Sequence, residues 1–248
     1  MKAAPQTTTD ADELQRFNRL AATWWDPDGP MWPLHLLNRF RVRVIEQVLR
    51  DSGVIAGDSS QPLQGLDVLD IGCGGGILSE SLARLGARVT GVDPAANNIA
   101  IARQHAESEQ LEIRYLQTEV GELNGQFDLV FNLEVVEHVA NLEAFMQASC
   151  ERLKPGGTQF LSTINRTCKS YVFAILGAEY VLRLLPKGTH QWHKFVRPEE
   201  LTQLLQQQGL ATVWSSGVAL NPFNRRYRLT KSHRVNYMLA AQRPAAQR

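Results

Sequence analysis

Asp70-Ile-Gly-Cys-Gly-Gly-Gly76 is the most informative segment of the sequence. It follows an apolar run at residues 66–71, which is expected to be a strand, and it precedes an expected helix at residues 76–85. Glycines at such a junction let backbone N–H groups approach a ligand closely, and the amino end of the helix favours a negative group. A tight turn without a ligand would have the same composition. The segment alone therefore predicts a strand, a turn and a helix, with the turn as a candidate nucleotide-type loop.

Strands and helices are predicted to alternate along most of the chain. The expected strands are residues 66–71, 88–92, 112–116, 127–132, 158–163, 210–218 and 235–241, the last two as a terminal hairpin. The expected helices between them are residues 76–85, 96–109, 142–153 and 198–208. Repeated strand–helix–strand units imply a parallel sheet with helices on both faces. The expected fold is therefore α/β and Rossmann-like, with a seven-stranded, mostly parallel sheet.

Three segments organise the chain around this core. Helical periodicity at residues 11–24 and 34–49, interrupted by Asp26-Pro-Asp-Gly-Pro30, predicts an N-terminal helical extension or lid over residues 1–50. The core domain, which contains the glycine loop, is expected to span residues 65–248. Within that domain the regular alternation fails at residues 164–197, a gap long enough to indicate a functional insertion.

Composition restricts the class of protein. The 248 residues include 26 basic and 25 acidic side chains, so the net charge of +1 predicts no nucleic-acid partner. Cys73, Cys150 and Cys168 lack metal-site or disulfide spacing, which favours a reducing compartment and a cytoplasmic location. No signal peptide, transit peptide or apolar run of about 20 residues is recognised. Any membrane contact is therefore expected to be peripheral.

Asp93 is expected at the end of the second strand, where a carboxylate can accept hydrogen bonds from ribose hydroxyls. That role fits either NAD or S-adenosylmethionine, and an ordinary capping aspartate before Pro94 is the structural alternative. Gly72, Gly74 and Gly76 follow a Gly-x-Gly-x-Gly spacing after Asp70, unlike the Gly-x-Gly-x-x-Gly dinucleotide fingerprint. An acidic Asp70 suits the ammonium and sulfonium of S-adenosylmethionine better than a pyrophosphate. An NAD-dependent dehydrogenase is the less favoured alternative.

Several motifs in order resemble those of class I S-adenosylmethionine-dependent methyltransferases. Besides the glycine loop and Asp93, they are Phe127-Asp-Leu-Val130, Glu134-Val-Val-Glu-His138 and Leu153-Lys-Pro-Gly-Gly157. Further segments resemble the ubiquinone-biosynthesis O-methyltransferase family from about Phe17 to Leu239. They are Trp24-Trp-Asp26, Pro33-Leu-His35 with Asn38 and Arg41, Gly177-Ala-Glu-Tyr180, Pro186-Lys-Gly-Thr-His190 and Val235-Asn-Tyr-Met238.

The resemblance implies a cofactor site and two acceptors. Residues that match the family's cofactor contacts are Arg41, Gly72, Asp93 and Leu133. The implied acceptors are a 2-polyprenyl-6-hydroxyphenol and 3-demethylubiquinol, and association with other enzymes of ubiquinone biosynthesis is a further expectation. Methylation of another phenol, or a non-catalytic scaffold that binds S-adenosylmethionine, are the alternatives.

Glu134, Glu137 and His138 are the candidate catalytic residues. Methyl transfer to a phenol needs help with deprotonation, because a phenol has a pKa near 10. If these residues begin a helix, their side chains share one face and could bind one cation, most simply Mg²⁺, that grips two vicinal oxygens. Alternatively His138 acts alone as general base. An amphipathic helix start with a solvated glutamate is the structural alternative.

The insertion is predicted to contact the membrane. It contains apolar runs, and between residues 164 and 197 it has six basic residues and one acidic residue: Arg166, Lys169, Arg183, Lys187, Lys194, Arg197 and Glu179. Basic residues near an anionic leaflet favour docking, and the apolar runs are too short to span a bilayer. A packed helix that covers the active site is the alternative.

Overall fold

The computed structural model describes residues 23–26, 29, 31–57, 59–167, 194–221 and 224–245. The expected helix at residues 11–24 lies almost wholly outside these residues. Most of the expected insertion, residues 168–193, also lies outside them. The predicted membrane contact of the insertion therefore falls mostly outside the described residues.

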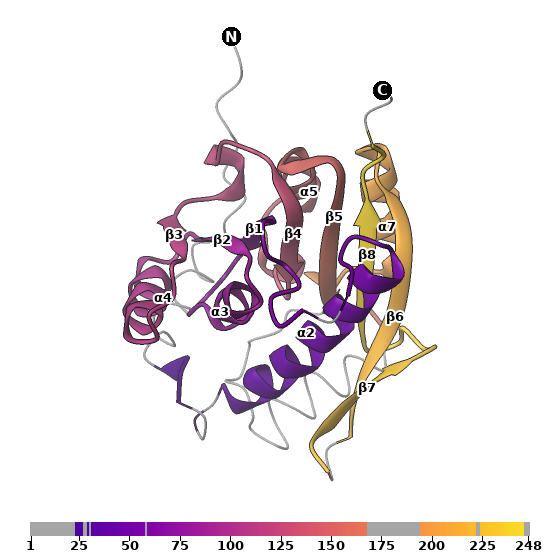
Figure 1. Ribbon diagram of the computed structural model, residues 1–248. Coiled ribbons are helices and arrows are strands. Elements are labelled where there is room, and N and C mark those ends of the chain that lie inside the picture. Colours follow the sequence, from indigo (N-terminus) through magenta and orange to yellow (C-terminus); the bar gives the residue numbers. More distant parts are fainter. Residues whose placement is uncertain are drawn as a thin grey trace.

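An eight-stranded sheet forms the centre of the described fold, in the order β3-β2-β1-β4-β5-β8-β6-β7 (Figure 1). The strands are β1 (Asp67–Ile71), β2 (Arg88–Asp93), β3 (Arg114–Gln117), β4 (Phe127–Leu133), β5 (Leu153–Ile164), β6 (Ala211–Asn221), β7 (Arg226–Thr230) and β8 (Asn236–Gln242). The pairs from β3 to β5 are parallel, and β8, β6 and β7 add antiparallel pairs. The Rossmann-like α/β prediction is confirmed.

Helices cover both faces of the sheet. They are α2 (Trp32–Asp51), α3 (Ile77–Arg84), α4 (Ala96–Ser108), α5 (Leu142–Glu151) and α7 (Pro198–Gln207), with short 3₁₀ turns η2 (Val120–Glu122) and η3 (Val136–His138). In Figure 1, α2, α3 and α4 lie in front of the sheet, and α5 and α7 lie behind it. This arrangement is the one that repeated strand–helix units produce.

Two apolar clusters explain how the sheet holds its helices. On one face, α2 and α3 pack on the sheet through buried residues that include Ile45, Leu49, Leu82 and Phe131. On the other face, α5 and α7 contribute residues such as Phe145 to a second cluster. Burial of such side chains stabilises each by roughly 1.5–3 kcal/mol. Helix α2 is thus part of the core and holds its polar residues rigidly against the sheet.

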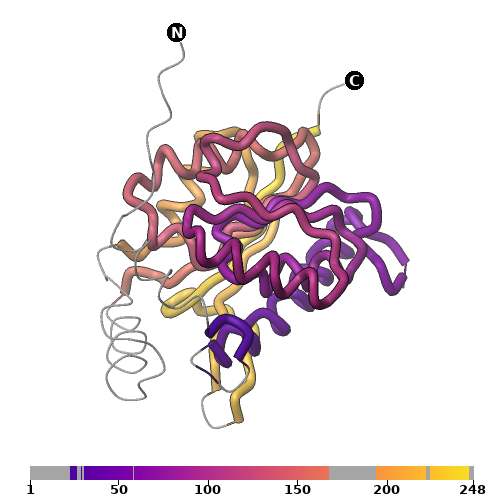
Figure 2. Tube along the Cα trace, turned by 90° about the vertical axis from the view of Figure 1, so that its left-hand side faces the viewer, coloured from indigo at the N-terminus to yellow at the C-terminus, as the bar shows by residue number. Residues whose placement is uncertain are grey.

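The prediction of seven strands was one short. The additional strand is β7, which pairs antiparallel with β6 from Gly217↔Thr230 to Asn221↔Arg226. Its sequence, Arg-Tyr-Arg-Leu-Thr, alternates polar and apolar residues over only five positions, and three of the five are exposed, so no buried apolar face marks it as a strand. The β6–β7 hairpin extends beyond the neighbouring strands, next to the start of α2 (Figures 1 and 2).

Strand β5 begins earlier than the strand expected at residues 158–163, and Pro155-Gly-Gly157 lies inside it. Residue Phe127 of β4 pairs with Leu153, whereas Leu129 pairs with Thr158, so β5 carries extra residues at this point. A bulge of this kind keeps a strand in the sheet while bending it locally. Gly156 has a φ of 78°, which explains why glycine is suited to the bulge.

Candidate active site

The glycine loop connects β1 to α3 at the carboxyl end of the parallel strands. Gly72 and Gly74 have φ values of 68° and 54°, in the left-handed region that favours glycine. Space is also short, because a Cβ on Gly72 would lie 2.7 Å from Cγ2 of Val135. Gly76, with a φ of 89°, precedes the first turn of α3. The structure therefore places the three predicted glycines in one tight loop beside the turn that follows β4.

Asp93 ends β2 and faces this loop. Its Oδ2 accepts a hydrogen bond from the Gly74 N–H at 3.0 Å, and its Oδ1 accepts from the Ala95 N–H at 2.8 Å and from Asn98 Nδ2 at 3.3 Å. We call these four residues the Asp93 cluster. Burial raises the pKa of the Asp93 carboxyl, while the hydrogen bonds from Ala95, Gly74 and Asn98 lower it. An ionised carboxylate offers about four acceptor positions, so the three donors leave capacity for a ribose hydroxyl.

Asp70 lies beneath the loop and is directed toward α3. Its side chain is 3% exposed, and its Oδ2 accepts a hydrogen bond from Ser79 Oγ at 2.6 Å. Burial raises the pKa of this carboxyl to about 7, against the lowering effect of Ser79, and the neighbouring Asp93 raises it further. A nearby cation would therefore favour the ionised form of Asp70.

Glu134 follows β4 in a left-handed conformation, with a φ of 60°. Its Oε1 accepts hydrogen bonds from the Arg41 guanidinium, from Ser162 Oγ at 2.9 Å and from Asn236 Nδ2 at 3.3 Å. Burial raises the pKa of Glu134, but Arg41, Ser162 and Asn236 outweigh it, so the pKa lies below its usual value. Glu134 is therefore a fixed negative charge beside a fixed positive one.

Glu137 is buried next to Glu134 but has a different environment. Its Oε2 accepts a hydrogen bond from Thr163 Oγ1 at 2.8 Å, while its buried Oε1 has no hydrogen-bond partner. Burial and then the charge of Glu134 hold the pKa of Glu137 well above its usual range. The Glu134 cluster comprises Arg41, Glu134, Glu137, Ser162, Thr163 and Asn236. Within it, burial beside the Glu134 charge favours the protonated form of the Glu137 carboxyl.

The helix expected at residues 134–138 is not formed. Glu134 lies in a left-handed turn, and only Val136–His138 forms a 3₁₀ turn, η3. The spacing argument that placed Glu134, Glu137 and His138 on one helix face therefore fails. Within the described ranges no group of three His, Cys, Asp or Glu side chains could hold a metal ion, and this includes these three. The three-ligand metal site is therefore not supported, because Arg41 binds Glu134 and Thr163 binds one of the two oxygens of Glu137.

The remaining predicted residues lie at the same end of the sheet. Leu133 is the half-buried last residue of β4, and His138 is half-buried at the end of η3. Arg41 is 3% exposed on α2 and also donates to Ser162 Oγ at 2.8 Å. Arg41 thus lies with Glu134, and any contact it makes with a cofactor would be shared with that carboxylate.

Sequence reasoning missed four polar residues of the site. Ser162 and Thr163 end the buried strand β5, and Asn236 begins β8, where Ile164 pairs with it. Asn98, in the first turns of α4, is 1% exposed and reaches Asp93. The available signal was a polar Ser-Thr pair at the carboxyl end of a largely buried strand, the usual position of ligand contacts in such sheets.

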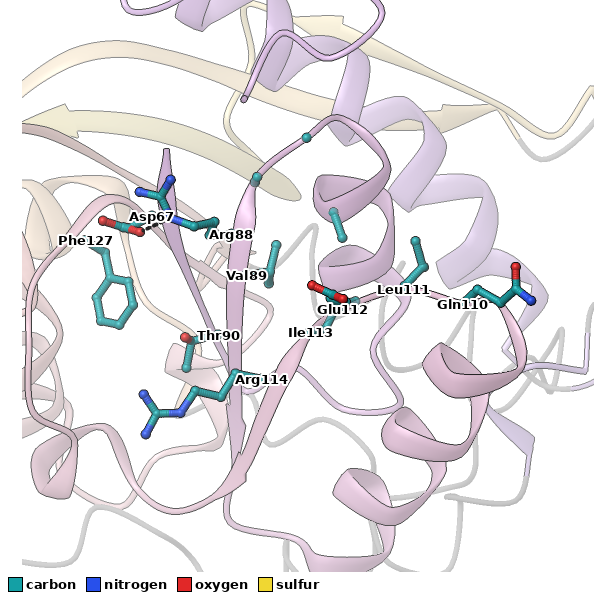
Figure 3. Close-up of a pocket in the computed structure, with 13 residues that line it drawn as sticks. Asp67, Arg88, Val89, Thr90, Gln110, Leu111, Glu112, Ile113, Arg114 and Phe127 are labelled. Atoms are coloured by element: carbon teal, nitrogen blue, oxygen red, sulfur yellow. Dashed lines mark hydrogen bonds and ion pairs between the residues drawn. The ribbon is translucent and has the colours of Figure 1, made fainter. Parts of the chain in front are cut away.

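A shallow groove of about 670 Å³ lies at the opposite end of the sheet (Figure 3). Its lining includes Asp67, Arg88, Arg114 and Phe127, which lie at the amino ends of four strands. Arg88 is occupied by an ion pair with Asp67 at 2.7 Å. Ligands of open α/β sheets bind at the carboxyl ends, so this groove is not the active site.

Comparisons with known proteins identify the fold and the family. The model of a methyltransferase domain family matches residues 13–215. Magnesium protoporphyrin IX methyltransferase from Synechocystis PCC 6803, solved with bound SAH, has a TM-score of 0.65 and 21% identity, covering 94% of this chain and 95% of that chain. At this identity the likeness shows a shared fold. The fold and the glycine loop thus define a class I S-adenosylmethionine-dependent methyltransferase.

Two sequence relatives narrow the assignment. The ubiquinone biosynthesis O-methyltransferase of Methylobacterium sp. (strain 4-46) is 46% identical, covering 99% of this chain and 100% of the relative. That of Methylobacterium nodulans is 49% identical, covering 96% of each. The chain therefore belongs to the ubiquinone biosynthesis O-methyltransferase family, and its activity is O-methyl transfer. The dehydrogenase alternative is excluded by this membership.

Helices that are long and apolar enough to cross a membrane do not occur in the described part of the chain.

Proposed function

We propose that the chain methylates phenolic hydroxyls of polyprenylated ubiquinone precursors, namely a 2-polyprenyl-6-hydroxyphenol and 3-demethylubiquinol. The observation that carries this proposal is the 46–49% identity with named family members over 96–99% of the chain. Both acceptors have adjacent phenolic oxygens, which suits a site with several polar groups in a small space.

The cofactor would lie at the glycine loop, with its ribose hydroxyls on Asp93. When bound, S-adenosylmethionine supplies an electrophilic methyl group for in-line displacement by the acceptor oxygen. The backbone of the loop, including Gly72 and Gly74, would fix its position, and Leu133 would form an apolar wall. The chain's main contribution is to hold the acceptor oxygen about 3–3.5 Å from the methyl carbon.

His138 would accept the phenolic proton. Imidazole is the side chain that most often exchanges protons at neutral pH. Glu137 is less suited as a base, because burial and the charge of Glu134 raise its pKa and favour its protonated form. Its Oε1, which lacks a partner, would instead contact the neighbouring oxygen of the acceptor. Glu134, held by Arg41, would provide fixed negative charge near the cationic cofactor.

A Mg²⁺ ion at this site would have fewer protein ligands than the three predicted from the sequence. Mg²⁺ commonly keeps several waters and binds one or two carboxylates together with substrate oxygens. The acceptor's two vicinal oxygens would then complete the site, with Glu137 as the protein ligand. Mg²⁺ would supply Lewis acidity that lowers the pKa of the phenol.

Glu137→Gln distinguishes the metal-free mechanism, in which His138 is the base, from the mechanism that uses Mg²⁺. Without metal, the introduced amide is an uncharged hydrogen-bonding group that resembles the protonated glutamate, so methyl transfer should persist. With Mg²⁺, the amide is a poor ligand, so transfer should be lost and chelator should inhibit the wild type.

The identity of the acceptor is tested directly with labelled S-adenosylmethionine. A short-chain 2-polyprenyl-6-hydroxyphenol should be methylated far faster than catechol, which has the same vicinal oxygens and no tail. Equal rates for the two would contradict the proposed acceptor, and a dead chain that still binds the cofactor would support the scaffold alternative.

Membrane contact is a further part of the proposal, because a polyprenyl tail partitions into the bilayer. The predicted insertion lies mostly outside the described residues. The β6–β7 hairpin beside the active site supports an orientation in which the active site faces the bilayer. From Leu201 to the end of the sequence there is no acidic residue. Five exposed bases lie on and after the hairpin: Arg225, Arg226, Arg228, Lys231 and Arg234.

The hairpin is at the active-site end of the sheet. Asn236 pairs with Val218 of β6, and the hairpin continues beyond this pair to Asn221 and Arg226. Arg225 lies over the ring of Trp32, with Cζ 4.5 Å from its centroid, which ties the hairpin to α2. Docking of these bases on anionic lipid would therefore direct the active site toward the bilayer.

Liposome co-sedimentation tests this orientation. Arg226→Gln/Arg228→Gln and Arg183→Gln/Lys187→Gln should each reduce binding to anionic vesicles, at about 1 kcal/mol for each base. Arg88→Gln/Arg114→Gln is the matched control, since it removes the same charge at the opposite end of the sheet. Equal sedimentation of all variants, or no preference for anionic lipid, would leave only the packed-helix alternative for the insertion.

A further inference from the structure

Trp24 lies directly against the glycine loop. It belongs to a short strap (residues 23–26) that precedes α2, and its side chain is 8% exposed. A Cβ on Gly74 would lie 2.6 Å from Cη2 of Trp24, and one on Gly75 would also overlap the indole. Two glycines of the loop are thus needed for the approach of Trp24.

A chain of hydrogen bonds connects Trp24 to the Asp93 carboxylate. The indole Nε1–H donates to Asn98 Oδ1 at 2.9 Å, and Asn98 Nδ2 donates to Asp93 Oδ1 at 3.3 Å. Trp24, Asn98 and Asp93 are all buried. In this environment a mispaired polar group is costly, because water cannot replace the lost partner.

The direction of this chain is fixed by Trp24. An indole N–H can only donate, so it requires the amide oxygen of Asn98 as its acceptor. The amide then has to present its NH₂ group to Asp93. The Asp93 carboxylate favours the same orientation, but without the indole donor the buried Asn98 oxygen loses its partner, and the amide could rotate away from Asp93 to satisfy it.

We propose that Trp24 is a positioning residue for the cofactor site, which sets the orientation of Asn98 and thereby holds Asp93 in the geometry that binds the ribose hydroxyls. The inference rests on the proposed role of Asp93. It assigns a function to the indole nitrogen that is separate from the packing of the ring.

The strap has other attachments that do not depend on this nitrogen. Trp25 Nε1 donates to the Gly75 carbonyl at 2.8 Å, and the Trp24 carbonyl lies 2.8 Å from His35 Nε2. The Trp25 ring also stacks on His105, with ring centroids 3.5 Å apart. Trp24→Phe should therefore remove the donor while the strap stays docked.

A double-mutant cycle tests the inference by calorimetric titration with S-adenosylhomocysteine. Trp24→Phe should raise the Kd roughly three- to tenfold, the effect of one hydrogen bond. In an Asn98→Ala background the same substitution should have almost no further effect on Kd. Hydrogen exchange of the Gly74 amide, which is bonded to Asp93, should become faster in Trp24→Phe. Trp214→Phe, on β6, is the matched control and should change neither quantity.

Each other outcome has a definite meaning. If Trp24→Phe weakens binding equally in the wild-type and Asn98→Ala backgrounds, the ring acts by packing and the inference is overturned. An unchanged Kd in Trp24→Phe overturns it as well, provided that Asp93→Ala still weakens binding. If Asp93→Ala also leaves Kd unchanged, the proposed role of Asp93 fails first.

Discussion

The Asp93 cluster and the Glu134 cluster lie at the same end of the sheet but satisfy their carboxylates in different ways. Asp93 accepts mainly from backbone N–H groups of Gly74 and Ala95, which are neutral donors fixed by the fold. Glu134 accepts from Arg41, a full charge on a separate helix. Glu137, beside it, has one hydrogen-bonded oxygen and one without a partner. The first cluster is suited to bind a neutral polar group. The second cluster holds a charged carboxylate beside a carboxyl that has one oxygen without a partner.

The largest expected effect is on kcat, and it distinguishes the acceptor side of the site from the cofactor side. His138→Ala should reduce kcat by about 10²–10⁴-fold, the usual contribution of a general base. The Kd for S-adenosylhomocysteine should change by no more than about twofold, because His138 serves the acceptor. His233→Ala is a control histidine whose described hydrogen bond is to Ser215. A retained kcat in His138→Ala would remove this residue from the mechanism.

Arg41→Ala should have the next largest effect, on stability. It leaves the Glu134 charge without its guanidinium partner, which costs about 3 kcal/mol in the free energy of unfolding. Arg39→Ala, an exposed arginine on the same helix, should cost less than about 0.5 kcal/mol. Denaturant titration of both variants measures the difference. Similar losses would mean that the Arg41–Glu134 pair contributes nothing beyond helix propensity.

A smaller effect should appear in the pH dependence of stability. The pKa of Asp70 is about 7 in the folded chain, above its ordinary value of 3.8. Between these values the folded chain keeps a proton that the unfolded chain has released, so this group lowers stability as the pH rises from about 4 to 7. Asp70→Asn should therefore gain stability relative to wild type over this range, with a constant difference above it.

Asp67 provides a control of opposite sign. The hydrogen bond from Arg88, followed by that from Lys154, lowers its pKa. Its contribution is thus present above the ordinary pKa of 3.8 and is lost as the pH falls. Thermal melts of Asp67→Asn and Asp70→Asn should diverge from wild type in opposite directions at pH 7. A pH-independent difference for Asp70→Asn would show that its carboxyl is not perturbed.

The two clusters also differ in how far the sequence predicted them. Gly72, Gly74 and Asp93 follow consecutive strands, so local periodicity places them together once a parallel sheet is assumed. Arg41 and Asn236, by contrast, are separated from Glu134 by 93 and 102 positions. No local pattern brings them together, and only the packing of α2 and the insertion of β8 beside β5 does so.

Two local errors have physical explanations. The left-handed conformation of Glu134 turns the chain sharply after β4. Residues 134–138 therefore do not form the helix start that would have placed their side chains on one face. The strand β7 was not predicted because it is only five residues long and three of these residues are exposed, so the sequence shows no buried apolar face there. The insertion at residues 164–197, most of which lies outside the described residues, and its membrane contact remain predictions.

The central claim is that the Asp93 cluster binds the cofactor and the Glu134 cluster serves the acceptor. One calorimetric comparison tests it most directly, with the same carboxylate-to-amide change in each cluster. S-adenosylhomocysteine should bind Asp93→Asn more weakly by about 1.5–3 kcal/mol, the loss of hydrogen bonds to a charged group. Its affinity for Glu137→Gln should match the wild type within about twofold. Equal losses in both variants, or a loss confined to Glu137→Gln, would contradict the account.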